Sequence, residues 1–92
     1  IGVGAVMTVY VDELRQYPQG RYCHMWTDES GETLDVFAKR IGLKLAWVQE
    51  SAATFGTFRH YDLTPRKRQS ALRSGAVYKP LKVWIRENRG GV

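Results

Sequence analysis

The sequence predicts a small single-domain α/β protein built on a three-stranded, mostly parallel sheet in the order βαβαβα. The chain has 92 residues, of which 43% are hydrophobic, enough for one core but not for two. Short runs of β-forming residues alternate with segments whose apolar residues recur at helical spacing. Such alternation is typical of helices that cross between parallel strands.

The first half of the domain is expected to contain two strands and the clearest helix. Residues 7–11 are rich in β-forming residues and form the first strand. Residues 14–27 are interpreted as a long loop, because proline and glycine interrupt them. Residues 28–42 follow as a helix and residues 43–50 as the second strand. The helix has a buried apolar stripe of Leu34, Phe37, Ala38 and Ile41.

Local chemistry marks a helix in the second half of the domain. Thr64 is a favoured N-cap residue, because its hydroxyl can accept a backbone N–H of the first turn. Pro65 follows at the first helical position, where its missing N–H costs nothing. Gly75 is suited to a helix end. The stretch before this helix includes residues 51–57, which are small and polar and are interpreted as a loop.

The last elements are a short strand at residues 76–78 and a helix that begins near Pro80. A strand over residues 79–85 is the alternative, since apolar residues also alternate there. Residues 1–6 are interpreted as a remnant of cloning, with a strand extension as the alternative. The domain then covers residues 7–88, and residues 89–92 form a flexible tail.

The charge balance favours an acidic partner. The formal net charge is +5, which suits a nucleotide, a nucleic acid or an acidic protein surface. No apolar run is long enough to cross a membrane, and the single cysteine cannot form an internal disulfide. We therefore expect a cytoplasmic protein without a membrane partner. The oligomeric state is left open.

Basic residues crowd the start of the helix predicted after residue 64. The positive end of a helix dipole disfavours each cation there by roughly 0.3–1 kcal/mol. A bound anion would explain them, because helix N-termini bind phosphates through free N–H groups. The alternative is a solvated basic face. The predicted ligand-binding residues are Arg59, Tyr61, Arg66, Lys67 and Arg68.

Imidazole and carboxylate side chains are the candidates for acid–base chemistry. The predicted catalytic residues are Asp12, His24, His60 and Asp62, and Asp28 is ambiguous between a helix cap and a site residue. Two histidines and a carboxylate can bind Mn, Fe, Zn or Ni, which makes a divalent metal the candidate cofactor, with His24, His60 and Asp62 as candidate ligands. Structural roles for these residues are the alternative. Because no established catalytic motif is present, the sequence leaves open whether the protein is an enzyme.

Several groups of residues form a pattern that extends from Met7 to about Ile85. They are Val9-Tyr10-Val11-Asp12, His24 with Asp28, Leu34-x-x-Phe37-Ala38-x-x-x-Gly42-Leu43, His60-Tyr61-Asp62, and Arg68 with Gly75-Ala76. The pattern is similar to a family of short bacterial and phage proteins that is a domain of unknown function. The resemblance implies that the polar residues belong to a family pattern, and it implies no activity.

Three functions follow from these observations. The first expectation is a basic single-domain protein that binds a phosphate-bearing ligand, a nucleotide or nucleic acid, through a His/Asp/Arg site. The alternative is a small metal-dependent hydrolase of phosphodiesters or nucleotides. The second alternative is a phage or bacterial protein-interaction module whose basic face meets an acidic partner.

Overall fold

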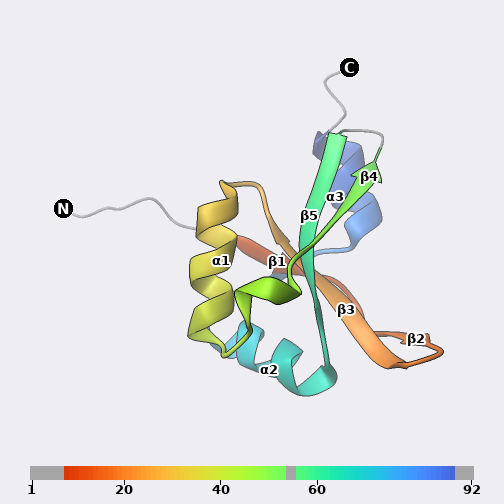
Figure 1. The fold of residues 1–92 in the computed structure, drawn as a ribbon. Helices are drawn as coiled ribbons and strands as arrows, with labels where there is room; N and C mark the ends of the chain where they lie inside the picture. The colour runs from red at the N-terminus through yellow and green to blue at the C-terminus, as the bar shows by residue number, and fades with distance from the viewer. Residues whose placement is uncertain (1–7, 54–55, 89–92) are drawn as a thin grey trace.

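A computed structural model describes residues 8–53 and 56–88, and these contain a six-stranded mixed sheet with three α-helices (Figure 1). The predicted remnant at residues 1–6, its alternative of a strand extension, and the predicted tail at residues 89–92 all lie outside the described residues. The elements are β1 (Val9–Val11), β2 (Arg15–Tyr17), β3 (Gly20–Thr27), α1 (Gly31–Arg40), the 3-10 helix η1 (Leu45–Trp47), β4 (Gln49–Ala53), β5 (Gly56–Leu63), α2 (Pro65–Arg73), β6 (Val77–Tyr78) and α3 (Leu81–Asn88).

The long strand β3 is the centre of the sheet. The strand order is β4-β5-β3-β1-β6, and β2 pairs with β3 outside this path. Strand β3 runs antiparallel to β1, β2 and β5, and β4 is antiparallel to β5. Among the described strands, only the β1–β6 pair is parallel. In this arrangement His24 of β3 lies opposite Asp62 of β5.

The predicted three-stranded, mostly parallel sheet is therefore wrong. Residues 14–27, interpreted as a loop, contain the hairpin of β2 and β3, with Gly20 at φ +139° in the turn. Residues 43–50 form η1 and only the start of β4; of the predicted loop at residues 51–57, residues 51–53 continue β4 and residues 56–57 begin β5. Residues of β3 alternate between a buried and a more polar face, so it lacks the continuous apolar run of a parallel strand.

The helices form where the local chemistry predicted them. The Ser30 hydroxyl accepts the Thr33 backbone N–H at the start of α1. The Thr64 hydroxyl accepts the Lys67 N–H at the start of α2, with Pro65 at the first position. Residues 81–88 are helical, so the alternative of a strand there is wrong. No helix in the described part of the chain combines the length and apolarity needed to cross a bilayer.

The two faces of the sheet are covered unequally. One face carries the main core, in which residues of β1, β3 and β5 pack against α1 and α2. Alternate residues of β3 and β5 point to the other face. There Trp26 and Phe58 pack against Trp84 of α3 in a smaller aromatic core. The remaining part of this second face is open and carries polar side chains.

Candidate metal site

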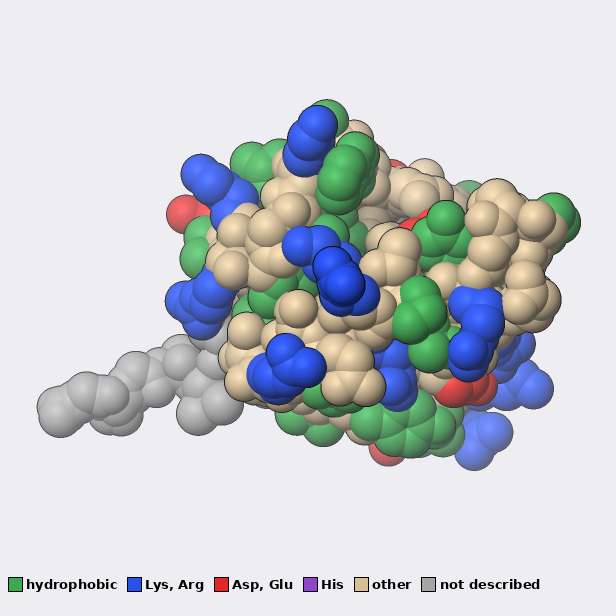
Figure 2. All heavy atoms as spheres, turned by 90° about the horizontal axis from the view of Figure 1, so that it is seen from below, with side chains coloured by type: hydrophobic (Ala, Val, Ile, Leu, Met, Phe, Trp, Pro, Cys, Tyr) green, Lys and Arg blue, Asp and Glu red, His purple; other side chains and the backbone are tan. Residues whose placement is uncertain are grey.

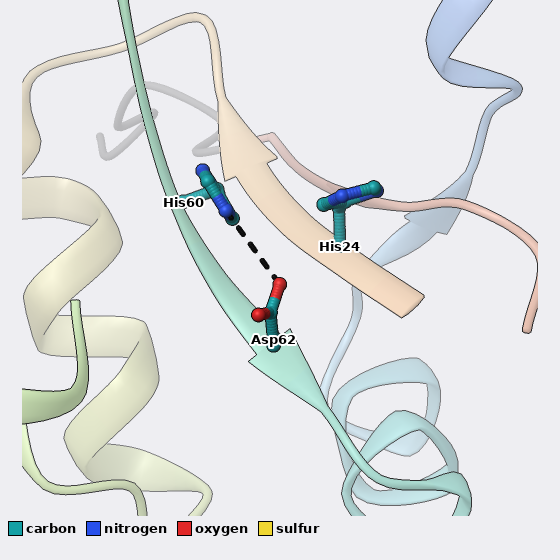
Figure 3. A group of neighbouring side chains, drawn as sticks. All are labelled: His24, His60 and Asp62. Carbon is teal, nitrogen blue, oxygen red and sulfur yellow. Dashed lines mark ion pairs between the residues drawn. The ribbon is translucent and has the colours of Figure 1, made fainter. Parts of the chain in front are cut away.

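Adjacent strands bring three candidate ligands together on the open part of the second face. His24 of β3 lies directly opposite Asp62 of β5, and His60 precedes Asp62 by two positions. Residues two apart on a strand share a face, so His60 and Asp62 lie on one side of β5, next to His24 (Figure 3). One ligand atom from each of the three residues lies within 4.8 Å of the other two. The sheet register itself therefore assembles the site.

Asp12 fixes the orientation of His24. It follows β1 and is 2% exposed. One carboxylate oxygen accepts the His24 backbone N–H at 2.6 Å, and the other accepts the ring Nδ1–H at 2.7 Å. In the neutral ring this arrangement leaves Nε2 with a lone pair for a ligand, because a neutral imidazole carries only one N–H. Asp12 was predicted to be catalytic, and its contacts are those of a residue that positions His24.

His60 and Asp62 are held in the same way. The Nδ1 of His60 lies 3.4 Å from the carbonyl oxygen of Phe58, which leaves Nε2 3.6 Å from Oδ1 of Asp62. The Gln49 side-chain amide donates to Oδ2 of Asp62 at 2.7 Å. Each candidate ligand thus has one polar atom engaged by an outer partner and a second polar atom that this partner does not engage. Metal ligands in proteins are typically supported by such partners.

The surroundings shift the pKa values of the two histidines in opposite directions. The hydrogen bond with Asp12 raises the pKa of His24, whereas burial lowers the pKa of His60. The two rings lie edge to face with centroids 5.2 Å apart, so two imidazolium charges would repel one another. A neutral His60 has the lone pair that a metal ligand needs.

The geometry allows a metal ion after a small adjustment. In a tetrahedral Zn²⁺ site with bonds of about 2.0–2.2 Å, ligand atoms are roughly 3.3–3.6 Å apart. The His60–Asp62 separation of 3.6 Å already falls there. The Asp62 side chain is 39% exposed, so its carboxylate can shift toward a metal ion beside buried His60, while Asp12 holds His24 in place. A pocket of about 360 Å³ opens onto the three residues. Three protein ligands beside an open pocket are typical of catalytic metal sites.

Arg59 and Tyr61, predicted to bind a ligand, instead join β5 to α1. The guanidinium of Arg59 donates to both oxygens of Asp35, at 2.7 and 2.9 Å, and to Glu50 at 3.2 Å. Tyr61 is 1% exposed and donates its hydroxyl to Asp35 at 2.7 Å. Because Arg59 and Tyr61 alternate with His60 and Asp62 along β5, they point to the opposite face of the sheet. That face carries the main core and lies away from the histidine cluster.

The cations of the first turn of α2 hold neighbouring backbone. Lys67 donates to the carbonyl of Ile41 at 2.7 Å, at the C-terminal end of α1 where a cation is favourable. Arg68 donates to the carbonyl of Asp12 at 2.9 Å, and Arg66 is exposed. In the view from below, over α2, Lys and Arg side chains are scattered among uncharged ones (Figure 2). Contacts with carbonyl groups account for two of these cations without a bound anion.

A family model described as "Protein of unknown function (DUF4031)" matches residues 9–89. The chain belongs to this family. The expected resemblance to a domain of unknown function is therefore confirmed, while an origin in bacteria and phages stays a prediction. Comparisons with curated proteins and with solved structures gave no significant match. All four predicted catalytic residues of this DUF4031 domain lie inside the matched span.

Sequence reasoning missed one contributor to the DUF4031 site and left another residue ambiguous. Gln49 was assigned to a strand but given no role, although it pairs with His60 across the β4–β5 ladder. Recognising that hairpin would have placed its amide beside Asp62. Asp28 accepts hydrogen bonds from the Tyr10 hydroxyl and the Trp84 indole, so it fastens α3 to the sheet.

Proposed function

We propose that this DUF4031 domain binds a divalent transition metal through His24, His60 and Asp62 and uses it to hydrolyse a phosphate ester. The observation that carries the proposal is the outer partner behind every candidate ligand: a carboxylate, a backbone carbonyl and an amide. Polar residues that meet on a surface by chance have no need of three such partners. Zn²⁺, Mn²⁺, Fe²⁺ and Ni²⁺ all accept imidazole and carboxylate ligands.

The proposed chemistry uses the open side of the cluster. A divalent metal would lower the pKa of a bound water and supply hydroxide at neutral pH. Hydroxide adds to phosphorus, and the P–O bond to the leaving alcohol breaks with its electron pair on the alcohol oxygen. The proton lost by the water ends on that oxygen. One water and one phosphodiester thus give one phosphate monoester and one alcohol.

The choice of a phosphate ester rests on charge. The net charge of +5 favours an anionic substrate, and a metal would add positive charge at the pocket. The predicted His/Asp/Arg phosphate site stays a prediction. The His and Asp side chains support it, whereas Arg59 and Arg68 are engaged elsewhere. The interaction with an acidic protein partner also stays a prediction.

Calorimetric titration of chelator-treated protein with Zn²⁺, Mn²⁺ and Ni²⁺ tests the metal site. We expect one ion per chain and a higher melting temperature in excess metal, because a ligand that binds only the native state stabilises it. Asp62→Asn should lower the affinity at least about tenfold. This change removes an exposed carboxylate without leaving a cavity, so the fold should persist.

The matched control is Glu32→Gln, which removes another exposed carboxylate, on α1 away from the cluster. Its metal affinity should equal that of the unmodified protein. Hydrolysis of bis(p-nitrophenyl) phosphate should require metal, stop with a chelator and resume when metal is restored. Absence of binding for all three ions, or equal affinities for both variants, would refute the metal site. Binding without metal-dependent hydrolysis would refute the enzymatic part.

A further inference from the structure

The pocket at the histidine cluster continues into a second hollow beside η1. The second hollow has a volume of about 560 Å³, within the range of small-molecule sites. The two hollows share four lining residues, Gln19, Tyr22, Gln49 and Asp62. They therefore form one groove, which we call the η1 groove, leading from the candidate metal ligands to Trp47.

Aromatic side chains from several elements line the η1 groove. Trp47 at the end of η1 is 51% exposed, although it is one of the largest apolar side chains in the chain. Tyr22 of β3 lines both parts of the groove, and Tyr17 lies beside it with ring centroids 6.5 Å apart. Solvent-exposed aromatic rings next to a pocket are suited to stacking on planar ligands.

Two side-chain amides add hydrogen-bonding groups to the same groove. Gln49 uses its NH₂ group on Asp62, which leaves its carbonyl oxygen for a ligand. Within the described residues, the Gln19 amide makes no hydrogen bond and is exposed. Glutamine amides both donate and accept, and they pair with the polar edges of nucleobases.

We infer that the η1 groove binds a nucleotide, with its phosphate at the histidine cluster and its base against Trp47 and Tyr22. The inference rests on the proposed function and names the substrate class of that site. A cation also stands at the base end, since the Lys44 ammonium lies 5.6 Å from the centre of the Trp47 ring. Stacking surface, edge-reading amides and positive charge together match a base joined to a phosphate. A plain phosphate ester would leave the exposed Trp47 ring without a stacking partner.

Tryptophan fluorescence offers a direct test. Trp26 and Trp84 are buried at 1% and 7% exposure, so quenching by a ligand in the groove should come from Trp47. Metal-loaded protein is titrated with the four nucleoside 5′-monophosphates and with ribose 5-phosphate. At least one nucleotide should bind more tightly than ribose 5-phosphate. Trp47→Leu, measured by calorimetry because it lacks the reporter ring, should weaken nucleotide binding by about 5- to 150-fold, the usual contribution of one stacked base.

The matched control is Leu45→Ala, which shortens another exposed apolar side chain of η1 that does not line the groove. It should bind nucleotides normally, and Trp47→Leu should keep unchanged affinities for metal and for ribose 5-phosphate. Equal binding of nucleotides and ribose 5-phosphate, or unchanged nucleotide affinity in Trp47→Leu, would overturn the inference.

Adenosine and metal titrations separate this inference from the proposed function. Adenosine carries no phosphate, so its quenching of Trp47 does not depend on a metal. If metal binding fails while adenosine, measured by calorimetry, binds the unmodified protein and not Trp47→Leu, the base site stands and the metal site falls. If metal binds but no nucleotide binds more tightly than ribose 5-phosphate, the metal site stands and the nucleotide inference falls.

Discussion

Replacing Asp12 with asparagine should weaken metal binding although Asp12 is not itself a proposed ligand. The carboxylate accepts both the backbone N–H and the ring Nδ1–H of His24. An asparagine of the same shape can accept only one of these hydrogen bonds, because its NH₂ group is a donor. If the NH₂ group faces the ring, the ring proton must move to Nε2, which then has no lone pair for a metal ion.

The expected loss of metal affinity is about 10- to 100-fold, as for other outer partners of metal ligands. This corresponds to about 1.4–2.7 kcal/mol of binding free energy. The free energy of unfolding should also fall, by about 1–3 kcal/mol, since a buried donor loses its acceptor. A domain of this size should tolerate that loss and remain folded.

Metal affinity is measured by competition with a chromophoric chelator, and stability by urea unfolding. Asp28→Asn is the matched control, because Asp28 also accepts two hydrogen bonds, from Tyr10 and Trp84, but away from the cluster. It should lower stability and leave metal affinity unchanged. The reasoning is refuted if Asp12→Asn binds metal normally, or if Asp28→Asn weakens binding to the same extent.

Three further predictions concern stability. Burial raises the pKa of Tyr10 to about 12, so as the pH rises the phenol loses its proton in the unfolded state before it does so in the folded state. The stability that this phenol contributes below pH 10 is therefore lost as the pH rises toward 12. Tyr10→Phe should reduce that alkaline loss in urea titrations at pH 9 to 12; an unchanged slope would contradict it. Lys67→Met should cost about 0.5–1.5 kcal/mol through its bond to Ile41, whereas Arg66→Met should cost almost nothing. Trp84→Ala should cost about 3–5 kcal/mol, measured as a lower unfolding midpoint, unless the aromatic core collapses around the gap.

Local chemistry predicted the helices and failed for the sheet. Thr64 and Pro65 define the start of α2 by interactions within a few residues, which a sequence shows directly. Strand β3 depends on partners far along the chain, and its polar alternate residues were interpreted as a loop. Once β3 and β5 are antiparallel neighbours, a parallel three-stranded sheet is impossible. Strand direction is a property of pairs, which a single segment does not encode.

The candidate site was predictable in its members and not in their arrangement. His24, His60 and Asp62 were chosen for residue type, and all three meet in the structure. Their convergence depends on the register of β3 and β5, which sets His24 opposite Asp62. These two strands are neighbours in the sheet, although α1 and β4 separate them in the sequence. The partners of Lys67 and Arg68 are backbone carbonyls, which leave no trace in a sequence. For this reason the sequence offered only a ligand or a solvated face as the explanation of the basic turn, and the ligand role stays a prediction.

The position of β1 between β3 and β6 has a consequence for how the chain folds during synthesis. The amino-terminal strand gains its second neighbour only after residues 77–78 have left the ribosome. Trp26 and Phe58 stay uncovered even longer, until Trp84 of α3 has been synthesised and packs against them. The nascent domain would therefore show an aromatic surface to chaperones until its last helix docks. The β3–β5 pairing that sets His24 opposite Asp62 is complete before then. The centre of the sheet therefore forms before α3 covers it.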